Sequence, residues 1–517
     1  MMNHSRNRTK LVYLNIFITL GTQVLQILLG FAVRKIFIIT LGVTYLGYNS
    51  VFDNILQMLN LADMGIGVAI TSFLYKPLAE NDNEKINSLM YIYKKIYRLL
   101  SIAVLGLGII ISFFLPAIIR DATCSFTYLR ILFYINLAGT VSTYYLAYKR
   151  TLLIADQKTY IASFVDTSVY LLASIIQIIL LFLWPNYIVY LIITVAKNIG
   201  SNIVLSVKCS KEYKCLDDPV NKSVVRDYKK SIIRYVKDIF LSRLGACVYY
   251  STDNIIISVF KGSLLTGYLS NYIMVTTQIN NLITRMLSSL QATFGNYIHT
   301  EESIEKQEAM TKNYLCIVYF IGNFCMVCIL SLIQPFIHLF FGAQYVLSFS
   351  TATWIAINLM MTIMIQLPSQ LFIIYKLYYY DKVIVAVSAA LNLVFSVLLV
   401  QPLGIDGVLI GTFVTSQIYL FSRFAIVCRK IYKTQYSDYV LMILRYYTIS
   451  AVTIGVVWVS TNWITDCTIR SFLFRLVIVG VEALVIPAAI LLGTKEFQFA
   501  LRKFVPKKIK NIFIGIR

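Results

Sequence analysis

The chain has 517 residues, of which 58% are hydrophobic and 14% are charged, and its mean hydropathy is +0.73. A soluble protein of this size could not bury so much apolar surface in its core. The net charge of +22 favours basic loops on the cytoplasmic side of an anionic membrane over binding to nucleic acid.

Apolar runs of roughly 20 residues, each long enough to cross a bilayer core of about 30 Å, recur along the whole chain. We therefore predict an all-α polytopic membrane protein with about 14 transmembrane helices. The predicted spans are 11–33, 39–62, 88–115, 126–148, 160–184, 187–207, 235–260, 267–297, 313–334, 348–375, 383–400, 406–428, 438–461 and 471–493. The first run is too long for a signal peptide and no small-residue cleavage site follows it, so we expect it to remain as a span.

Basic residues predict the orientation of these spans. With the N-terminus inside, the outer loops contain only Arg120, Lys261 and Arg470 of the 46 Lys and Arg residues. This asymmetry predicts that both termini are cytoplasmic.

The two halves of the chain contain a faint repeat. The run from Gly42 through Gly47 to Tyr48 aligns with the run from Gly262 through Gly267 to Tyr268. Further on, the acidic segment 80–85 resembles 301–306. The matches follow equivalent spans, so they predict two pseudo-symmetric six-helix lobes with a cavity between them.

The repeat and the charge pattern together predict five parts of the chain. They are an N-terminal lobe (1–207), a basic cytoplasmic linker (208–234), a C-terminal lobe (235–430), two extra transmembrane helices (431–493) and a basic cytoplasmic tail (494–517). The linker and the tail are interpreted as membrane-surface segments, the tail as an amphipathic helix.

No catalytic constellation stands out. The three histidines (His4, His299, His338) are far apart, and no phosphate-binding glycine loop is present. Cys325 and Cys328 have redox or metal spacing but lie in an apolar run without nearby His or Asp, which favours a packed core. We expect a transporter without a cofactor, a metal or an enzymatic activity of its own.

The informative residues are the ionisable groups within the spans, because a charge in mid-bilayer needs a wet cavity or a partner. Arg34 either reaches the outer interface, as we expect for Lys35, or lies in the cavity and holds an anionic head group. Asp53 and Asp253 either bind a coupling ion or pair with an arginine.

Further polar residues complete the candidate substrate site. They are Arg243, Asn254 and Arg285, beside Arg34 and Asp253. For other charges within spans we expect interhelical pairing or interface positions: Arg130, Asp166, Lys197, Arg423 and Glu482.

Several stretches of the chain resemble a known family. Segments 41–56, 74–86, 251–262 and 339–348 are similar to those of Wzx-type polysaccharide flippases, in the superfamily that includes multidrug and toxin extrusion (MATE) proteins and the lipid II flippase. The resemblance implies a MATE-like fold in the bacterial inner membrane. It also implies translocation of undecaprenyl-pyrophosphate-linked oligosaccharide repeat units for O-antigen, lipopolysaccharide or capsule.

The resemblance also bears on partners and on the site. It implies a lipid-linked oligosaccharide substrate and membrane lipids, with a polysaccharide polymerase and glycosyltransferases as further partners and no nucleic acid. Arg34 matches a cavity arginine of the lipid II flippase, whereas Gln57 and Tyr272 stand where that protein has two more. This difference argues against lipid II as cargo.

Two alternatives remain open. One is a cation-coupled multidrug exporter on the same fold, whose cavity should be dominated by acids. The other is a non-transporting membrane scaffold for glycan assembly, whose lobes should pack without a cavity.

Overall fold

The computed structural model describes residues 2–60, 63–156, 158–233, 252–464 and 466–504, and these contain helices and connecting loops but no strand. Two compact units are present, Met1–Gly267 and Tyr268–Arg517. The fold is therefore all-α, as predicted. The boundaries of the five predicted parts, including the linker 208–234, stay a prediction.

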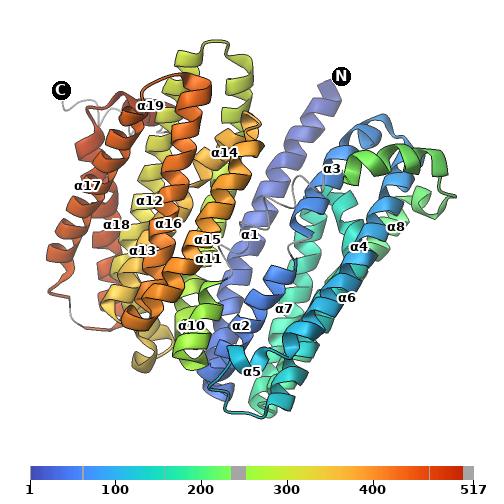
Figure 1. Cartoon of the computed structure of the whole chain (residues 1–517), viewed down its shortest axis with the longest axis horizontal. Helices are drawn as coiled ribbons and strands as arrows, with labels where there is room; N and C mark the ends of the chain where they lie inside the picture. The colour runs from blue at the N-terminus through green and yellow to red at the C-terminus, as the bar shows by residue number, and fades with distance from the viewer. Residues whose placement is uncertain (1, 61–62, 157, 234–251, 465, 505–517) are drawn as a thin grey trace. The chain divides into compact units, whose positions relative to one another are not determined.

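The first unit is a bundle in which α4, α6 and α8 pack side by side, and α1 packs on α7 (Figure 1). Its elements are α1 Met2–Leu41, α2 Val43–Leu59, α3 Asp63–Glu80, α4 Asn83–Ser112, α5 Leu115–Ile118, α6 Phe126–Ala155, α7 Thr159–Leu183, α8 Tyr187–Glu212, the short η2 Lys214–Asp217, and α10 Asp253–Lys261.

The second unit is built on α12, which contacts α13, α17, α18 and α19, while α15 packs on α16. Its elements are α11 Ser263–Thr300 (which begins in the first unit), α12 Ile304–Phe340, η3 Ala343–Tyr345, α13 Phe349–Met364, α14 Gln366–Ile374, α15 Tyr378–Leu403, α16 Ile405–Val427, the π-helical turn η4 Cys428–Tyr432, α17 Tyr436–Thr461, α18 Ile469–Leu491 and α19 Lys495–Phe504.

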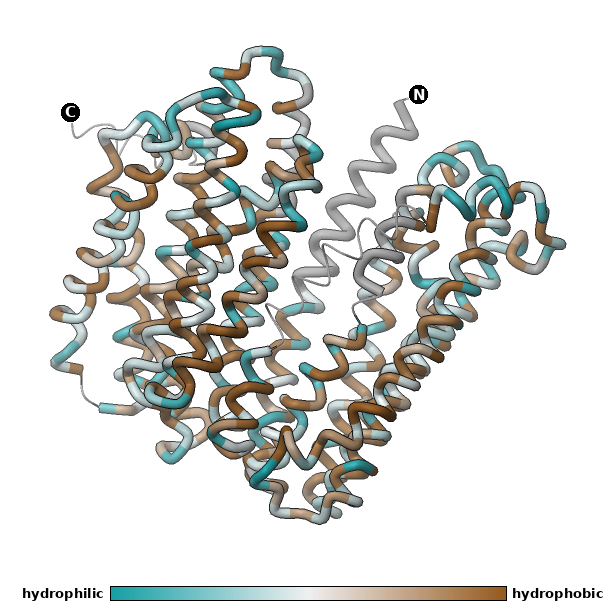
Figure 2. Tube along the Cα trace, in the orientation of Figure 1, coloured by the Kyte–Doolittle hydropathy of each residue, from teal (hydrophilic) through white to brown (hydrophobic). Residues whose placement is uncertain are grey.

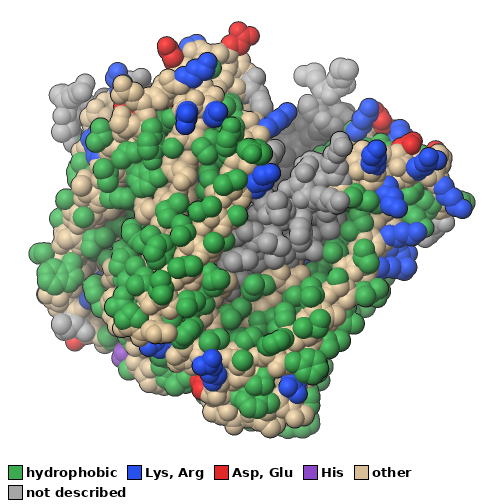
Figure 3. Space-filling model, viewed as in Figure 1, with side chains coloured by type: hydrophobic (Ala, Val, Ile, Leu, Met, Phe, Trp, Pro, Cys, Tyr) green, Lys and Arg blue, Asp and Glu red, His purple; other side chains and the backbone are tan. Residues whose placement is uncertain are grey.

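Ten helical segments among the described residues are long and apolar enough to cross a membrane. Figure 2 shows hydrophobic residues along the helices and hydrophilic ones near their ends, and in Figure 3 Lys and Arg lie mostly near the helix ends. Three helices coincide with predicted spans but are not among the ten: α2, α6 and α11. The helix α2 is short, while α6 and α11 carry more polar residues along their length.

The backbone shows that the two copies of the repeat have the same local geometry. Gly42, before α2, has φ 89° and ψ 164°, and Gly262, before α11, has φ 93° and ψ 164°. A residue with a Cβ would be strained at such positive φ values. At the next turn, Asp82 accepts a hydrogen bond from the backbone N–H of Lys85 to cap α4, and Ser303 accepts one from Lys306 to cap α12.

One difference separates the copies. In the second half, α11 is a single helix over Ser263–Thr300. In the first half, the same length of chain is divided into α2 and α3, with Asn60 as the C-cap of α2. The predicted span 39–62 corresponds to α2, but α3 over Asp63–Glu80 lies between the predicted spans 39–62 and 88–115 and was not predicted.

The predicted span 313–334 ends just before Pro335, but the helix continues beyond this proline. Pro335 lies inside α12, which continues to Phe340. A proline lacks an N–H and leaves the carbonyl four residues earlier without its helical donor. That carbonyl, of Ser331, accepts a hydrogen bond from Arg475 Nη1 on α18 at 3.4 Å, so a neighbouring helix replaces the missing interaction.

Charges within the spans pair between helices, as predicted. Asp166 on α7 accepts hydrogen bonds from Arg150 on α6 and from Ser201 on α8. On α18, Glu482 accepts one from Ser460 on α17 at 2.6 Å. These pairs satisfy polar groups that would otherwise be costly in lipid.

The described cysteines form no disulfide. Cys325 is buried and Cys328 half-buried on α12, which agrees with packing positions. Cys124 and Cys467 are unpaired with each other. Cys247 lies outside the described residues.

Candidate functional site

A polar face runs along α2 within the first unit. Asn49, Asp53 and Gln57 are spaced four residues apart, so they lie on one side of the helix. Asp53 and Gln57 are exposed, and the Asn49 side-chain amide donates to Asp53 Oδ2 at 2.8 Å. An exposed carboxylate and amides in a helix at membrane depth indicate contact with water rather than with lipid.

Aromatic residues at the start of α8 hold this face in position. The Tyr187 hydroxyl donates to Asn49 Oδ1 at 3.0 Å, and its ring is buried. Phe37 of α1 packs edge-on against both Tyr187 and Tyr190, with ring centroids 5.6 and 4.8 Å apart. The hydrogen bonds from Tyr187 through Asn49 to Asp53 therefore connect α8 to the carboxylate on α2.

Two cations lie within electrostatic reach of Asp53. They are Arg34 of α1 and Lys197 of α8. Arg34 also interacts with Tyr190, and the Lys197 amine lies 5.0 Å from the centroid of the Tyr170 ring on α7. The cluster thus combines one carboxylate, two cations and several tyrosines from α1, α2, α7 and α8.

Helix geometry gives the depth of these charges. Arg34 lies about 10 Å along the axis before the end of α1 at Leu41, given a rise of about 1.5 Å per residue. Asp53 and Lys197 lie about 15 Å from the starts of α2 and α8 by the same rise. A bilayer core is about 30 Å thick, so Lys197 lies about half-way along the length of α8, one of the ten candidate spans, that is needed to cross it.

Sequence reasoning found part of this cluster. Arg34 and Asp53 were candidates, and the structure brings them together. Lys197 was expected to pair between helices or to lie at an interface; it lies within electrostatic reach of Asp53 and so joins the same cluster. Asn49 and Tyr187 were missed, although the four-residue spacing of polar positions on α2 was a usable signal for Asn49.

The other candidate residues lie elsewhere. Asp253 and Asn254 are the first two residues of α10, which packs on α2 and α5. Asp253 is half-buried and Asn254 buried. Arg285 is exposed on α11, in the second unit. Arg243 lies outside the described residues. The roles of all these residues in substrate binding stay predictions.

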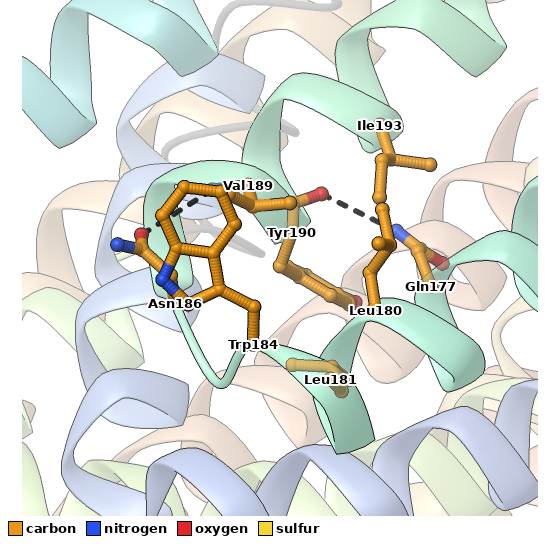
Figure 4. A pocket seen from close by; sticks show the side chains of 8 residues that line it. All are labelled: Gln177, Leu180, Leu181, Trp184, Asn186, Val189, Tyr190 and Ile193. Carbon is orange, nitrogen blue, oxygen red and sulfur yellow. Dashed lines mark hydrogen bonds between the residues drawn. The ribbon is translucent and has the colours of Figure 1, made fainter.

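A shallow crevice lies between α7 and α8, next to the polar cluster (Figure 4). Trp184 and Asn186 come from the turn between the helices, and the Gln177 amide donates to the backbone oxygen of Tyr190 at 3.4 Å. Its lining is mostly apolar, and it is too small for a sugar. No described group of His, Cys, Asp and Glu residues is arranged to hold a metal ion.

The chain is similar in structure to several solved membrane transporters. The lipid II flippase MurJ, in an inward closed conformation, superposes with a TM-score of 0.69 at 13% identity, covering 93% of this chain and 99% of MurJ. An inward-facing multidrug resistance MATE transporter gives a TM-score of 0.63 at 16% identity, over 81% of this chain and 99% of its own. A MOP-superfamily transporter from Pyrococcus furiosus gives 0.54 at 17% identity, over 82% and 96%. At these identities the similarity defines the fold, which is that of MurJ and the MATE transporters.

The family follows from the sequence itself. Residues 12–294 match the model of the polysaccharide biosynthesis protein family, and the chain belongs to this family. A search of curated protein sequences finds no match. The predicted resemblance to polysaccharide flippases of the MOP superfamily is confirmed at this level.

Proposed function

We propose that this protein is a flippase that moves an undecaprenyl-pyrophosphate-linked oligosaccharide across the bacterial inner membrane for surface polysaccharide biosynthesis. The family match supports the pathway class, and the MurJ-like fold supports transport of a lipid-linked cargo. The substrates that we propose are the repeat units of O-antigen, lipopolysaccharide or capsule.

The observation that carries the proposal is the cationic cluster in the first unit. Arg34 and Lys197 outnumber Asp53, and both lie within membrane-length helices, beside exposed polar groups on α2. Arginine binds phosphate through a planar fork of hydrogen bonds, and a low-dielectric surrounding strengthens the attraction.

The mechanism we propose is alternating access. The cavity takes the pyrophosphate and sugars from the inner leaflet, the lobes rock, and the oligosaccharide leaves on the outer side while the polyprenyl chain stays in lipid. The driving force is either an ion gradient or consumption of the product outside. A polymerase and glycosyltransferases would act as partners, and both termini would be cytoplasmic.

Depletion of the protein in its native cell tests the proposal. We expect a lipid-linked oligosaccharide to accumulate that lectins added to spheroplasts cannot reach, with surface polysaccharide lost. Wild-type protein supplied in trans should restore both. Unchanged surface polysaccharide and an unchanged lipid-linked pool would contradict the proposal.

A cation-coupled multidrug exporter on the same fold is the second candidate, and the exposed Asp53 carboxylate favours it. It predicts that depletion raises sensitivity to cationic drugs and leaves the lipid-linked pool unchanged. A scaffold for glycan assembly predicts that synthesis of the lipid-linked oligosaccharide itself fails, so that nothing accumulates.

A further inference from the structure

Lys197 is the least expected member of the cluster. It lies mid-way along α8, three turns from Tyr187, and its amine faces the Tyr170 ring at 5.0 Å. A cation at this depth costs at least roughly 2.5 kcal/mol unless it has a partner or water. Asp53, on a different helix, is the charged partner with which Lys197 interacts.

The position of Asp53 is fixed by hydrogen bonds rather than by the cations alone. The Asn49 amide donates to its Oδ2 at 2.8 Å, and Tyr187 holds Asn49 in turn at 3.0 Å. Asp53 nonetheless remains exposed, so a ligand can approach it. The carboxylate is thus a fixed anion placed within reach of Arg34 and Lys197.

The charges around Asp53 make it a poor site for a coupling cation. A metal ion or ammonium beside this carboxylate would be repelled by both Arg34 and Lys197. A diphosphate, in contrast, carries more negative charge than one carboxylate and can interact with both cations at once.

We propose that Lys197 is a second phosphate-binding cation beside Arg34, and that Asp53 is an internal counter-ion that neutralises the two cations until a diphosphate head group takes its place. This inference rests on the proposed function for its choice of ligand. Asp53 lowers the affinity for anions in general, so only a ligand with several negative charges competes well. Lys197 and Asp53 therefore set selectivity for diphosphate over monophosphate.

The test measures binding of farnesyl diphosphate, farnesyl monophosphate, inorganic pyrophosphate and farnesol to the purified full chain in detergent. Lys197→Met should weaken farnesyl diphosphate binding about tenfold, whereas Lys197→Arg should keep it, because the interaction is largely charge-based. Asp53→Asn should tighten binding of both phosphates about tenfold and reduce the preference for diphosphate. Lys208→Met, which removes an exposed cation further along α8, is the matched control and should change neither ligand.

The direction of the Asp53→Asn effect decides the matter. Weaker or unchanged phosphate binding in Asp53→Asn would overturn the counter-ion role. If Na⁺ promotes ligand binding to the wild-type protein but not to Asp53→Asn, Asp53 binds a coupling cation instead. Equal loss in Lys197→Met and Lys197→Arg would show a packing role for Lys197. If pyrophosphate binds as tightly as farnesyl diphosphate, the site recognises the phosphate groups without the isoprenyl chain, which supports the proposal. If the farnesyl phosphates bind no more tightly than farnesol and pyrophosphate does not bind, the proposal of a phosphate site is wrong.

These outcomes are separable from failure of the proposed function. If the variants follow the predicted order but depletion leaves the lipid-linked pool unchanged, the phosphate site stands and the flippase proposal falls. If depletion traps the lipid-linked oligosaccharide but the variants do not follow that order, the assignment of Lys197 and Asp53 falls alone.

Discussion

Arg423 is a buried charge in the second unit, with only 3% of its surface exposed. Its guanidinium donates to Asp381 Oδ1 from Nε at 3.1 Å and from Nη2 at 2.5 Å, and Nη2 also donates to the Tyr419 hydroxyl at 2.7 Å. The side chain therefore ties α16 to the start of α15, and Asp381 depends on it for charge compensation.

Arg423→Met should destabilise the protein by about 3 kcal/mol, because it leaves the half-buried Asp381 carboxylate without its guanidinium partner. The double variant Arg423→Met/Asp381→Leu should recover most of this loss. Thermal unfolding in detergent measures both. A double variant as unstable as Arg423→Met would show that the guanidinium packing, not the charge pair, carries the stability.

At the scale of single residues, the sequence indicated which ionisable residues lie within apolar runs, but not which of them lie close together. Arg34 and Asp53 could be chosen because ionisable residues within apolar runs are costly. How close they lie to each other and to Lys197 depends on how α1, α2 and α8 pack together. The packing of these helices cannot be worked out from one sequence alone. Tyr187 was hidden among 37 tyrosines, most of which suit a membrane interface equally well.

The helices α2 and α11 approach each other through glycines that occupy equivalent places in the repeat. A Cβ on Gly47 would lie 2.0 Å from the Ser263 carbonyl oxygen, and one on Gly267 would lie 2.4 Å from that of Val43. Both obstacles are backbone atoms, so neither can move aside by changing a rotamer. The glycines in the repeat therefore permit a close helix crossing.

Gly47→Ala should lower the melting temperature clearly, because the two backbones must separate to admit the methyl group. Gly455→Ala on α17 is the control, since nothing lies within 4 Å of its added Cβ; it should stabilise by roughly 0.5–1 kcal/mol through helix propensity. Equal melting temperatures for Gly47→Ala and wild type would contradict the close crossing.

The two helix caps of the repeat differ in one respect that can be titrated. The side-chain hydrogen bond from Lys85, together with its backbone N–H, lowers the pKa of Asp82, while the equivalent cap Ser303 carries no charge. A lowered pKa means that the charged cap stabilises the folded state above the unfolded pKa of about 3.9, and that this contribution is lost as the pH falls through the lower folded value.

Asp82→Ala should therefore cost about 1 kcal/mol at pH 7 and progressively less below pH 4, as expected for a titrating N-cap. Ser303→Ala should cost about the same at both pH values, because a hydroxyl cap does not titrate there. Denaturation midpoints at the two pH values check this. A cost of Asp82→Ala that stays constant down to pH 3 would contradict the charged cap.

For the whole molecule, composition and apolar length predicted the all-helical membrane fold, and the repeat predicted two related halves with the same glycine geometry. The extent of helix was harder to predict. The predicted spans end at 62 and at 334, yet the mostly apolar stretch Asp63–Glu80 forms α3, and α12 continues through Pro335 to Phe340. At Pro335 the reason is tertiary: Arg475, far along the chain, donates to the carbonyl that the proline leaves open.

The central claim is that this chain moves a lipid-linked oligosaccharide across a bilayer. The direct measurement uses proteoliposomes containing the purified protein and a fluorescent isoprenyl-diphosphate oligosaccharide, with a membrane-impermeant quencher outside. Our account predicts protein-dependent exchange of the labelled lipid between leaflets, slowed at least tenfold by Arg34→Ala in a folded protein and unaffected by Lys208→Met. Exchange no faster than in protein-free vesicles would contradict the account, and full exchange by Arg34→Ala would contradict its phosphate site.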